Sequence, residues 1–178
     1  MAKHRVHRDP VVQPQDQSIK HVALTKGKVA IVDADDYAAV MEFNWNAQKS
    51  HSGTFYAKGS HGGPLLHRFV LRMSDPKIQI DHANGNTLDN RKSNLRVATH
   101  EQNRQNRGAY KNSKSGYAGV HWHRRDKVWV VYVNTNGKRT YCGEYEDKET
   151  AIAARIAAEV EQHGEFAFSN RHIKTNPS

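Results

Sequence analysis

The chain has 178 residues, enough for one ordinary domain or two small ones. Its 27 lysine and arginine residues outnumber 18 acidic ones and give a formal charge of +9, which favours a polyanionic partner such as nucleic acid. The apolar share of 37% lies below the roughly 45–50% of ordinary globular domains, so we expect small cores. A single cysteine, Cys142, excludes an internal disulfide and a zinc–cysteine cluster.

No segment has the features of a signal peptide, and no apolar run approaches the roughly 20 residues that a membrane span needs. We therefore expect a soluble, intracellular, cytoplasmic protein that has no membrane partner. No strong self-association surface is evident in the pattern, so a monomer is expected.

Residues 1–18 mix His, Arg, Pro and Gln with few apolar side chains and predict a flexible basic arm, either a plain tail or a loose phosphate contact. The apolar runs 21–24 and 29–32 then flank Lys26-Gly27, which predicts a hairpin. A short helix is expected over 36–42, with acidic residues in its first turn. Trp45 is expected as a core anchor, and residues 55–57 predict another strand. Residues 65–71 are apolar enough for a buried strand or helix.

Residues 78–107 carry the most informative pattern of the chain. Two short alternating runs, 78–80 and 95–97, predict strands separated by a long loop rich in Asn, Asp and Gly. Thr99, three residues before Gln102, forms a capping box that predicts the start of a helix. Asp81 and His82 would then end the first strand, and Asn103 would face back toward them from the helix.

This set of side chains suits one kind of chemistry. A carboxylate and an amide oxygen are ligands for a hard divalent cation such as Mg²⁺. A histidine beside such an ion can act as general base toward a water, which predicts phosphodiester hydrolysis. The alternative is a polar surface hairpin with an incidental Asp-His pair.

The spacing resembles that of the HNH (ββα-metal) endonucleases, in particular their homing-type members, through Asp81-His82, Asn94 and Thr99-x-x-x-Asn103. The resemblance implies that His82 is the general base and that Asp81 and Asn103 hold the metal. It also implies that Asn94, which counts with His82 as a catalytic residue, ties the long loop across the hairpin by side-chain hydrogen bonds. Many members have histidine where Asn103 stands; asparagine there implies Mg²⁺ or Mn²⁺ as the cofactor. A phage or a mobile element is a fitting source for such a protein.

Cations around this core are candidate contacts to DNA. The dipeptide His67-Arg68 resembles one that precedes the HNH core in many homing nucleases, and a structural or phosphate-contacting role fits it better than catalysis. Residues 103–116 form a basic, Asn/Ser/Gly-rich run that predicts a linker able to follow the DNA backbone. The DNA-binding candidates in these segments are Arg68, Arg91, Arg96, Arg104, Arg107, Lys111 and Lys114.

A second module is predicted from residue 117 onward. Strands are expected at 120–123, 129–133 and 139–142, with an Asn-Gly hairpin turn at 134–137. A helix capped by Asp147 and ending at Gly164 should back this three-stranded antiparallel sheet. The strand residues expected to pack on the alanine face of the helix (Ala151, Ala154, Ala158) are Val120, Trp122, Trp129, Val131, Val133 and Cys142.

The alternation leaves a basic, aromatic face open, a candidate for docking in a DNA groove. This segment resembles the Apetala-two-type (ethylene-response-factor) DNA-binding domain through Tyr117-x-Gly119-Val120, Trp129-x-Val131 and Gly143-x-Tyr145. The resemblance implies that outward sheet residues read bases and phosphates in the major groove, although histidines replace arginines in the first strand and Val130 stands on the second. The candidates are His121, His123, Arg125, Tyr132, Arg139 and Tyr141.

The expected fold is α+β: a ββα-metal (HNH) nuclease core with small N-terminal strands, then a three-stranded antiparallel sheet backed by one helix. The expected parts are an arm (1–18), the nuclease domain (19–107), a basic linker (108–116), the Apetala-two-type domain (117–170) and a tail (171–178). The expected function is a site-specific, homing-type endonuclease acting on double-stranded DNA with Mg²⁺ or Mn²⁺. The alternatives are a DNA-binding regulator with a vestigial HNH site and a nonspecific HNH nuclease.

Overall fold

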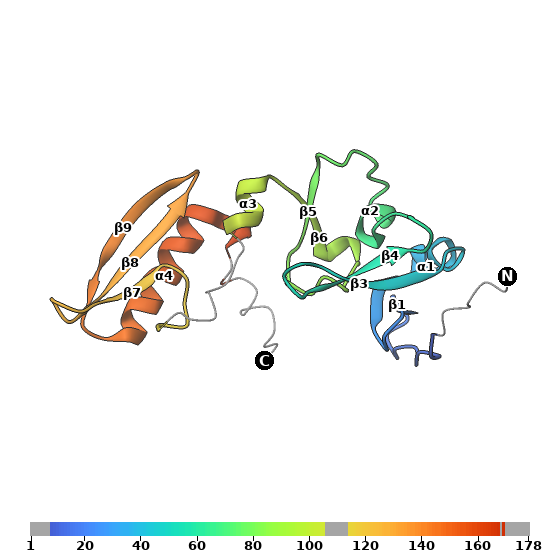
Figure 1. The fold of residues 1–178 in the computed structure, drawn as a ribbon, viewed down its shortest axis with the longest axis horizontal. Helices are drawn as coiled ribbons and strands as arrows, with labels where there is room; N and C mark the ends of the chain where they lie inside the picture. The colour runs from blue at the N-terminus through green and yellow to red at the C-terminus, as the bar shows by residue number, and fades with distance from the viewer. Residues whose placement is uncertain (1–7, 106–113, 168, 170–178) are drawn as a thin grey trace. The chain divides into compact units, whose positions relative to one another are not determined.

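The computed structural model describes residues 8–105, 114–167 and 169 of the chain (Figure 1). The chain divides into two compact units, residues 1–97 and 98–178, each with its own hydrophobic core. The structure is a mixed α/β protein with several small sheets and few helices. None of the helices in the described part of the chain has the length and apolar character that a membrane crossing requires.

The first unit opens with the predicted hairpin of β1 (Ile19–Ala23) and β2 (Val29–Asp33). Lys26 and Gly27 both have positive φ angles, 62° and 60°, as a type I′ turn requires. Helix α1 (Ala34–Met41) follows β2 directly and begins before the predicted start at residue 36. The hairpin prediction is therefore confirmed, and the helix prediction is wrong only at its boundary.

A second hairpin and a short helix complete the core of this unit. Strand β3 (Trp45–Lys49) pairs with β4 (Phe55–Gly59), and only the second of these was expected. Trp45 is buried, as expected for a core anchor, and its ring nitrogen donates to the carbonyl of Val40 at 2.8 Å. The run 65–71, expected as strand or helix, contains helix α2 (Leu66–Val70).

Strands β5 (Gln79–His82) and β6 (Leu95–Ala98) pair in a two-stranded sheet, with the single-turn helix η1 (Lys92–Asn94) before β6. The loop between them is fixed to strand β2. The amide of Ile31 donates to the carbonyl of Leu88 at 2.8 Å, and the amide of Asn90 donates to the carbonyl of Ile31 at 2.7 Å. The N-terminal strands therefore support the loop that carries Asn94.

The described part of the N-terminal arm is attached to the first unit. The Nε of Arg8 donates to the carbonyl of Trp45 at 2.7 Å, and its Nη2 donates to Oδ1 of Asn46 at 2.8 Å. Gln13 exchanges hydrogen bonds with the backbone of His21. Residues 8–18 are thus hydrogen-bonded to β1 and β3 instead of forming a loose arm; residues 1–7 lie outside the described part.

The second unit contains α3 (His100–Gln105) and the antiparallel sheet β7 (Val120–His123), β8 (Val128–Thr135) and β9 (Lys138–Tyr145). Helix α4 (Lys148–His163) packs along one face of this sheet and is followed by the short helix η2 (Gly164–Phe166) (Figure 1). The predicted sheet backed by one helix is therefore present, with the Asp147 side chain accepting from the amide of Thr150 as its cap. Because β5 and α3 belong to different units, the ββα arrangement stays a prediction.

The face of α4 that is buried differs from the predicted alanine face. Its most buried residues are spaced four apart: Ala151, Arg155, Glu159 and His163. Nη1 of Arg155 lies 3.0 Å from Oε2 of Glu159, and both side chains are almost fully covered. Only Ala151 of the three predicted alanines is fully buried, so the contact is centred on an ion pair.

Two predicted burial assignments in the sheet are also wrong. Trp122, expected in the core, is 37% exposed and packs on Trp129 with ring centroids 5.1 Å apart. Val130, expected on the open face, is only 7% exposed although it pairs with His121. Cys142 does pack against the core, as predicted.

Replacing Gly119 with alanine tests how closely β8 and α4 approach it. A Cβ there would lie 2.3 Å from the carbonyl oxygen of Tyr132 and 2.6 Å from Nε of Arg155, and the φ angle is +81°. Gly119→Ala should cost about 3 kcal/mol of unfolding free energy, measured by urea denaturation.

Gly116 is the matched control, because its φ is +73° and a Cβ there would meet nothing within 4 Å. Gly116→Ala should cost only about 1 kcal/mol for the backbone conformation. Equal losses in the two variants would show that the close approach at Gly119 contributes nothing.

Candidate active site

Asp81 and His82 end strand β5, as predicted, and are 9% and 4% exposed. The two residues are consecutive but have different neighbours. Arg96 of strand β6 lies beside Asp81, whereas the rings of Tyr56 and His67 lie beside His82. A buried carboxylate and a buried imidazole are thus held at one strand end, each with its own partners.

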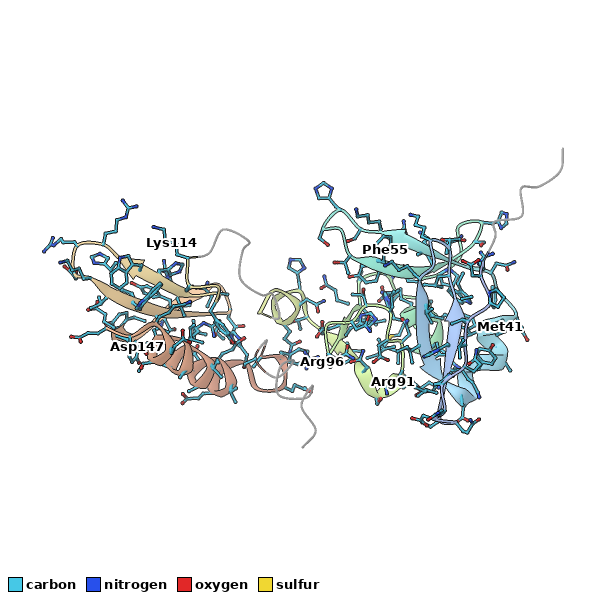
Figure 2. The ribbon with its side chains drawn as sticks, turned by 90° about the horizontal axis from the view of Figure 1, so that it is seen from below. Met41, Phe55, Arg91, Arg96, Lys114 and Asp147 are labelled. Atoms are coloured by element: carbon cyan, nitrogen blue, oxygen red, sulfur yellow. The ribbon has the colours of Figure 1, made fainter. Side chains whose placement is uncertain are left out.

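The carboxylate of Asp81 is held by a guanidinium. Nε and Nη2 of Arg96 donate to Oδ2 of Asp81 at 3.0 and 2.7 Å. The two charges compensate each other in a site with little access to water. Arg96 (Figure 2) was expected to contact DNA; in this structure its guanidinium orients Asp81, and a contact to DNA stays a prediction.

A cluster of three rings surrounds His82. The rings of His67 and His82 are perpendicular, with centroids 5.3 Å apart, and Tyr56 lies 6.0 Å from the first and 6.2 Å from the second. Burial, and then the charges of His82 and Arg68, lower the pKa of His67 to about 3. His67 is therefore a neutral imidazole near pH 7.

Asn94 connects the two ends of the loop between β5 and β6. Its Oδ1 accepts from the amide of Asn84 at 2.9 Å, and its Nδ2 donates to the carbonyl of Asp89 at 2.8 Å. These bonds cross the loop as the resemblance implied, while a role of Asn94 in the reaction stays a prediction.

The buried carboxylate of Asp89 is a second fixed point of the loop. It accepts from Nε of Arg91 at 2.8 Å and from Nδ2 of Asn84 at 2.8 Å. Burial alone would raise the pKa of Asp89, but the hydrogen bonds and charge of Arg91 outweigh it and lower the pKa. Arg91 (Figure 2) therefore has a structural partner, and its proposed DNA contact is untested.

Asn103 lies in helix α3 of the second unit. The predicted capping box is confirmed: the amide of Gln102 donates to Oγ1 of Thr99 at 3.2 Å, and the amide of Thr99 donates to Oε1 of Gln102 at 2.7 Å. Asn103 is thus placed in the first turn of a capped helix. Because Asp81 belongs to the first unit, their sharing of a metal ion stays a prediction.

The predicted pair of ligands has the chemistry of a hard-cation site. A carboxylate such as that of Asp81 and an amide oxygen such as that of Asn103 are ligand types that Mg²⁺ and Mn²⁺ take together with water. Within the described ranges, no three His, Cys, Asp or Glu side chains come together as a metal-binding group.

The other predicted DNA contacts near the core have mixed outcomes. Arg68 donates to the backbone carbonyls of Ile78, at 2.9 Å, and of Asp75. Its guanidinium therefore holds the segment before β5. The side chain of Arg104, and the residues Arg107 and Lys111 in the predicted linker, lie outside the described residues.

The predicted DNA-binding residues of the second unit lie on the sheet face opposite α4 or beside it. Arg139 stacks on the ring of Tyr132 with its guanidinium carbon 3.7 Å from the ring centroid, and Tyr132 packs on Tyr141 at 5.7 Å. His123 lies 2.9 Å from the carboxylate of Asp126, and Arg125 lies 3.4 Å from it. His121 and Lys114 are exposed as well. Contact of these residues with DNA stays a prediction.

His67 was expected to have a structural or phosphate-contacting role and was not placed in the site. It stands in an apolar run, where a histidine has no local signature of what it faces. Its neighbour His82 is far along the chain, so only the tertiary fold brings the rings together. The His67-Arg68 dipeptide before the core was the one available signal.

Comparisons with known proteins agree with the motif. The HNH endonuclease family matches residues 65–105. An uncharacterized HNH endonuclease, L560, of Acanthamoeba polyphaga mimivirus is 35% identical over 96 residues, which cover 50% of this chain and 49% of that protein. Protein 3.8 of Escherichia phage T7 is 32% identical over 88 residues, which cover 49% of this chain and 72% of the phage protein.

These matches have a limited extent. The chain spans about half the length of the mimivirus protein. The family match ends at residue 105, and none of the matches supports an Apetala-two-type domain at residues 117–170. The relatives therefore support the nuclease motif, whereas the description of the second unit rests on its structure alone.

Replacing His67 with glutamine tests whether this side chain is buried as a neutral imidazole. The pKa of His67 is about 3 in the folded protein against an ordinary value of 6.5, so the unfolded chain binds the extra proton between these values. Stability from this group is complete above pH 6.5 and is lost as the pH falls toward 3. As the pH falls from about 7 to about 4.5, the unfolding free energy of His67→Gln, measured by urea denaturation, should decrease less than that of the parent.

The exposed His51 provides the control, because His51→Gln should keep the acid sensitivity of the parent. The chosen window also lies above the range in which Asp89 takes up its proton, since the pKa of Asp89 is lowered from 3.8. Identical acid sensitivity in His67→Gln and the parent would refute the neutral burial.

Proposed function

The chain belongs to the HNH endonucleases, whose domain it carries at residues 65–105, and we propose that it is a homing-type enzyme that cleaves double-stranded DNA at specific sites. The observation that carries this proposal is the complete set Asp81, His82, Asn94 and Asn103 within the matched residues. The formal charge of +9 suits a substrate made of phosphates.

His82 is the proposed general base. It accepts the proton of a water that attacks the phosphorus atom, a role worth roughly 10²–10⁴-fold in rate. The ring of His67 stays neutral near pH 7, so no adjacent imidazolium opposes the charge that His82 gains in this step. The bond between phosphorus and the 3′ oxygen breaks, so one fragment ends in a 3′ hydroxyl and the other carries a 5′ phosphate.

Asp81 and Asn103 are the residues that would hold a divalent cation, Mg²⁺ or Mn²⁺. When bound, such an ion stabilises the negative charge on the leaving oxygen. Arg96 supports this arrangement because its two hydrogen bonds to Oδ2 fix the orientation of the Asp81 carboxylate. Asn94 supports it because its bonds hold the loop that follows His82.

The second unit is proposed to dock the DNA. The sheet face opposite α4 carries Arg139, Tyr132, Tyr141 and His121, and the guanidinium of Arg139 stacks on the Tyr132 ring. Cations and aromatic rings on one face suit phosphates and bases. The resemblance to the Apetala-two-type domain points the same way, and the proposal rests on the face itself.

Two alternatives are separable by simple assays. A DNA-binding regulator with a vestigial site would bind supercoiled plasmid but leave it uncut both with Mg²⁺ and with EDTA. The complete residue set argues against it. A nonspecific nuclease would keep its cleavage pattern when residues 117–178 are removed, whereas a site-specific enzyme would lose its site preference.

Replacing His82 with alanine tests the general base. His82→Ala should lower the rate of plasmid cleavage by roughly 10²–10⁴-fold, because no group remains to take the proton of the water. DNA affinity, measured by fluorescence anisotropy, should be unchanged. Because His82 is buried, a thermal unfolding curve must show that the variant is folded; His51→Ala, at an exposed histidine, should cleave like the parent. Cleavage by a folded His82→Ala at the parent's rate would show that the base is another group.

Replacing Arg139 with glutamine tests the docking face. The loss of its charge should weaken duplex binding about tenfold and reduce site preference, while slow nicking continues at the intact nuclease site. Lys148→Gln removes a cation from α4, on the other side of the sheet, and should change neither property. A parallel loss of nicking and of site preference in Arg139→Gln, or equal effects of both variants on binding, would contradict docking through this face.

A further inference from the structure

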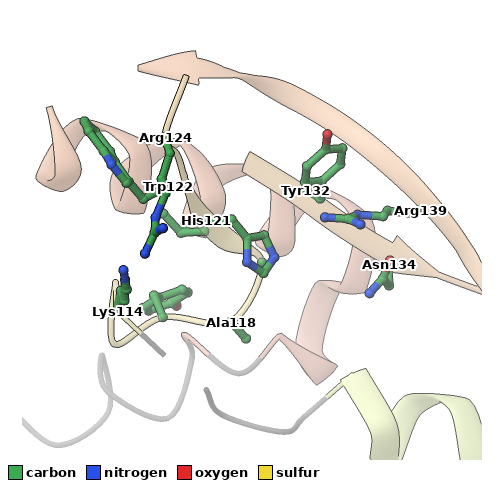
Figure 3. A pocket seen from close by; sticks show the side chains of 11 residues that line it. Lys114, Ala118, His121, Trp122, Arg124, Tyr132, Asn134 and Arg139 are labelled. Atoms are coloured by element: carbon green, nitrogen blue, oxygen red, sulfur yellow. The ribbon is translucent and has the colours of Figure 1, made fainter. Parts of the chain in front are cut away.

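A pocket of about 680 Å³ lies where the loop of residues 114–119 meets the open face of the second unit's sheet (Figure 3). The side chains that define it are Lys114, His121, Trp122, Arg124, Tyr132 and Arg139. Lys114 and Arg124 lie toward one end, Tyr132 and Arg139 lie toward the other, and His121 lies between them (Figure 3). The open face is thus hollowed at this point.

The charge of the pocket selects an anion. Three of its side chains, Lys114, Arg124 and Arg139, are cations. Of the described residues that line it, none is acidic. Burial and the charge of Arg139 lower the pKa of His121, so this ring is a neutral hydrogen-bonding group near pH 7. An anionic ligand therefore meets no negative charge among these residues.

One end of the pocket offers a flat surface. The guanidinium of Arg139 lies 3.7 Å from the centroid of the Tyr132 ring, which is the geometry of a stacked cation–π pair. The Tyr132 ring is itself held between neighbours, with centroids 5.7 Å from Tyr141 and 6.4 Å from His121. Stacked guanidinium and aromatic planes are the surfaces on which proteins lay nucleobases.

The size and shape of the pocket define what can enter. Its volume lies within the range of roughly 300–1,000 Å³ that small-ligand sites occupy. In a duplex the faces of each base are covered by the neighbouring base pairs, so a base can reach a flat surface inside a pocket only when it is outside the stack. A nucleotide has a group suited to each end of the pocket: a phosphate for the cations Lys114 and Arg124, and a base for the flat surface at Arg139 and Tyr132.

We propose that this pocket binds one unstacked nucleotide of single-stranded DNA, with its phosphate toward Lys114 and Arg124 and its base on the Arg139–Tyr132 stack. The inference rests on DNA being the substrate of the nuclease and names its preferred form, a duplex that contains an unpaired stretch. The paired flanks contact the rest of the sheet face.

The test compares two DNA probes bound to the full chain: a fluorescently labelled duplex, and the same duplex with a short unpaired bubble that carries 2-aminopurine. The bubble should bind about tenfold more tightly than the duplex, and the 2-aminopurine emission should be quenched by stacking. Arg139→Lys keeps the charge but removes the planar group, so it should lose both the preference and the quenching, while its duplex affinity falls less than that of Arg139→Gln. Lys148→Gln changes a cation of α4, outside the pocket and on the other side of the sheet, and should keep both the preference and the quenching.

Equal binding of the two probes by the parent chain, or an unchanged preference in Arg139→Lys, would overturn the proposal. Cleavage of both probes in Mg²⁺ serves as the separate check on the nuclease. A chain that cuts the duplex but shows no preference for the bubble overturns the pocket proposal alone. A chain that prefers the bubble with quenching but cuts neither probe supports the pocket and contradicts the proposed cleavage.

Discussion

The two hydrogen bonds of the Asn94 side chain hold the active-site loop in place, and the candidate site depends on them. The loop begins directly after His82 and returns through Asn94 into β6. With both halves of its amide bonded, to the amide of Asn84 and the carbonyl of Asp89, Asn94 is buried at little cost. Loss of this side chain would leave buried backbone groups without partners, a penalty of about 1–3 kcal/mol for each. Strand β2 adds backbone bonds to the same loop, so the nuclease motif needs strands that precede it in the chain.

Both units compensate for small apolar cores with buried polar groups. In the first unit, Asp89 pairs with Arg91 beneath the loop. In the second unit, Arg155 pairs with Glu159 between α4 and the sheet, and the hydroxyl of Tyr117 donates to Glu159 at 3.4 Å. Burial, and then the charge of Glu159, raise the pKa of Tyr117 to about 12, so this hydroxyl stays protonated as a donor. Such pairs demand good geometry because removal of one partner leaves an uncompensated charge. Gly119 lies against Arg155, so the close packing around this ion pair leaves no room for a side chain at position 119.

Local signals in the sequence predicted local structure well. The turn at Lys26-Gly27, the capping box that begins at Thr99 and the position of Asp81-His82 at a strand end all follow from neighbouring residues, and the structure confirms them. Contacts between distant residues were not predictable in this way. The alanine-rich pattern of α4 concealed Arg155, because a charged residue at a helix position does not reveal that a partner one turn away allows its burial. His67 was likewise invisible as a neighbour of His82. The meeting of Asp81 with Asn103 was inferred from the pattern of strands and capped helix and from the family resemblance, and it stays a prediction.

Calorimetric titration of the full chain with Mn²⁺ measures whether Asp81 and Asn103 share one divalent ion. If they do, the parent binds the ion, and Asp81→Asn and Asn103→Ala each weaken binding about tenfold or more, because each removes an oxygen ligand. Asp35→Asn, at an exposed acid outside the site, should bind as the parent does. Unchanged Mn²⁺ affinity in Asn103→Ala would show that helix α3 supplies no ligand and that the two residues share no ion.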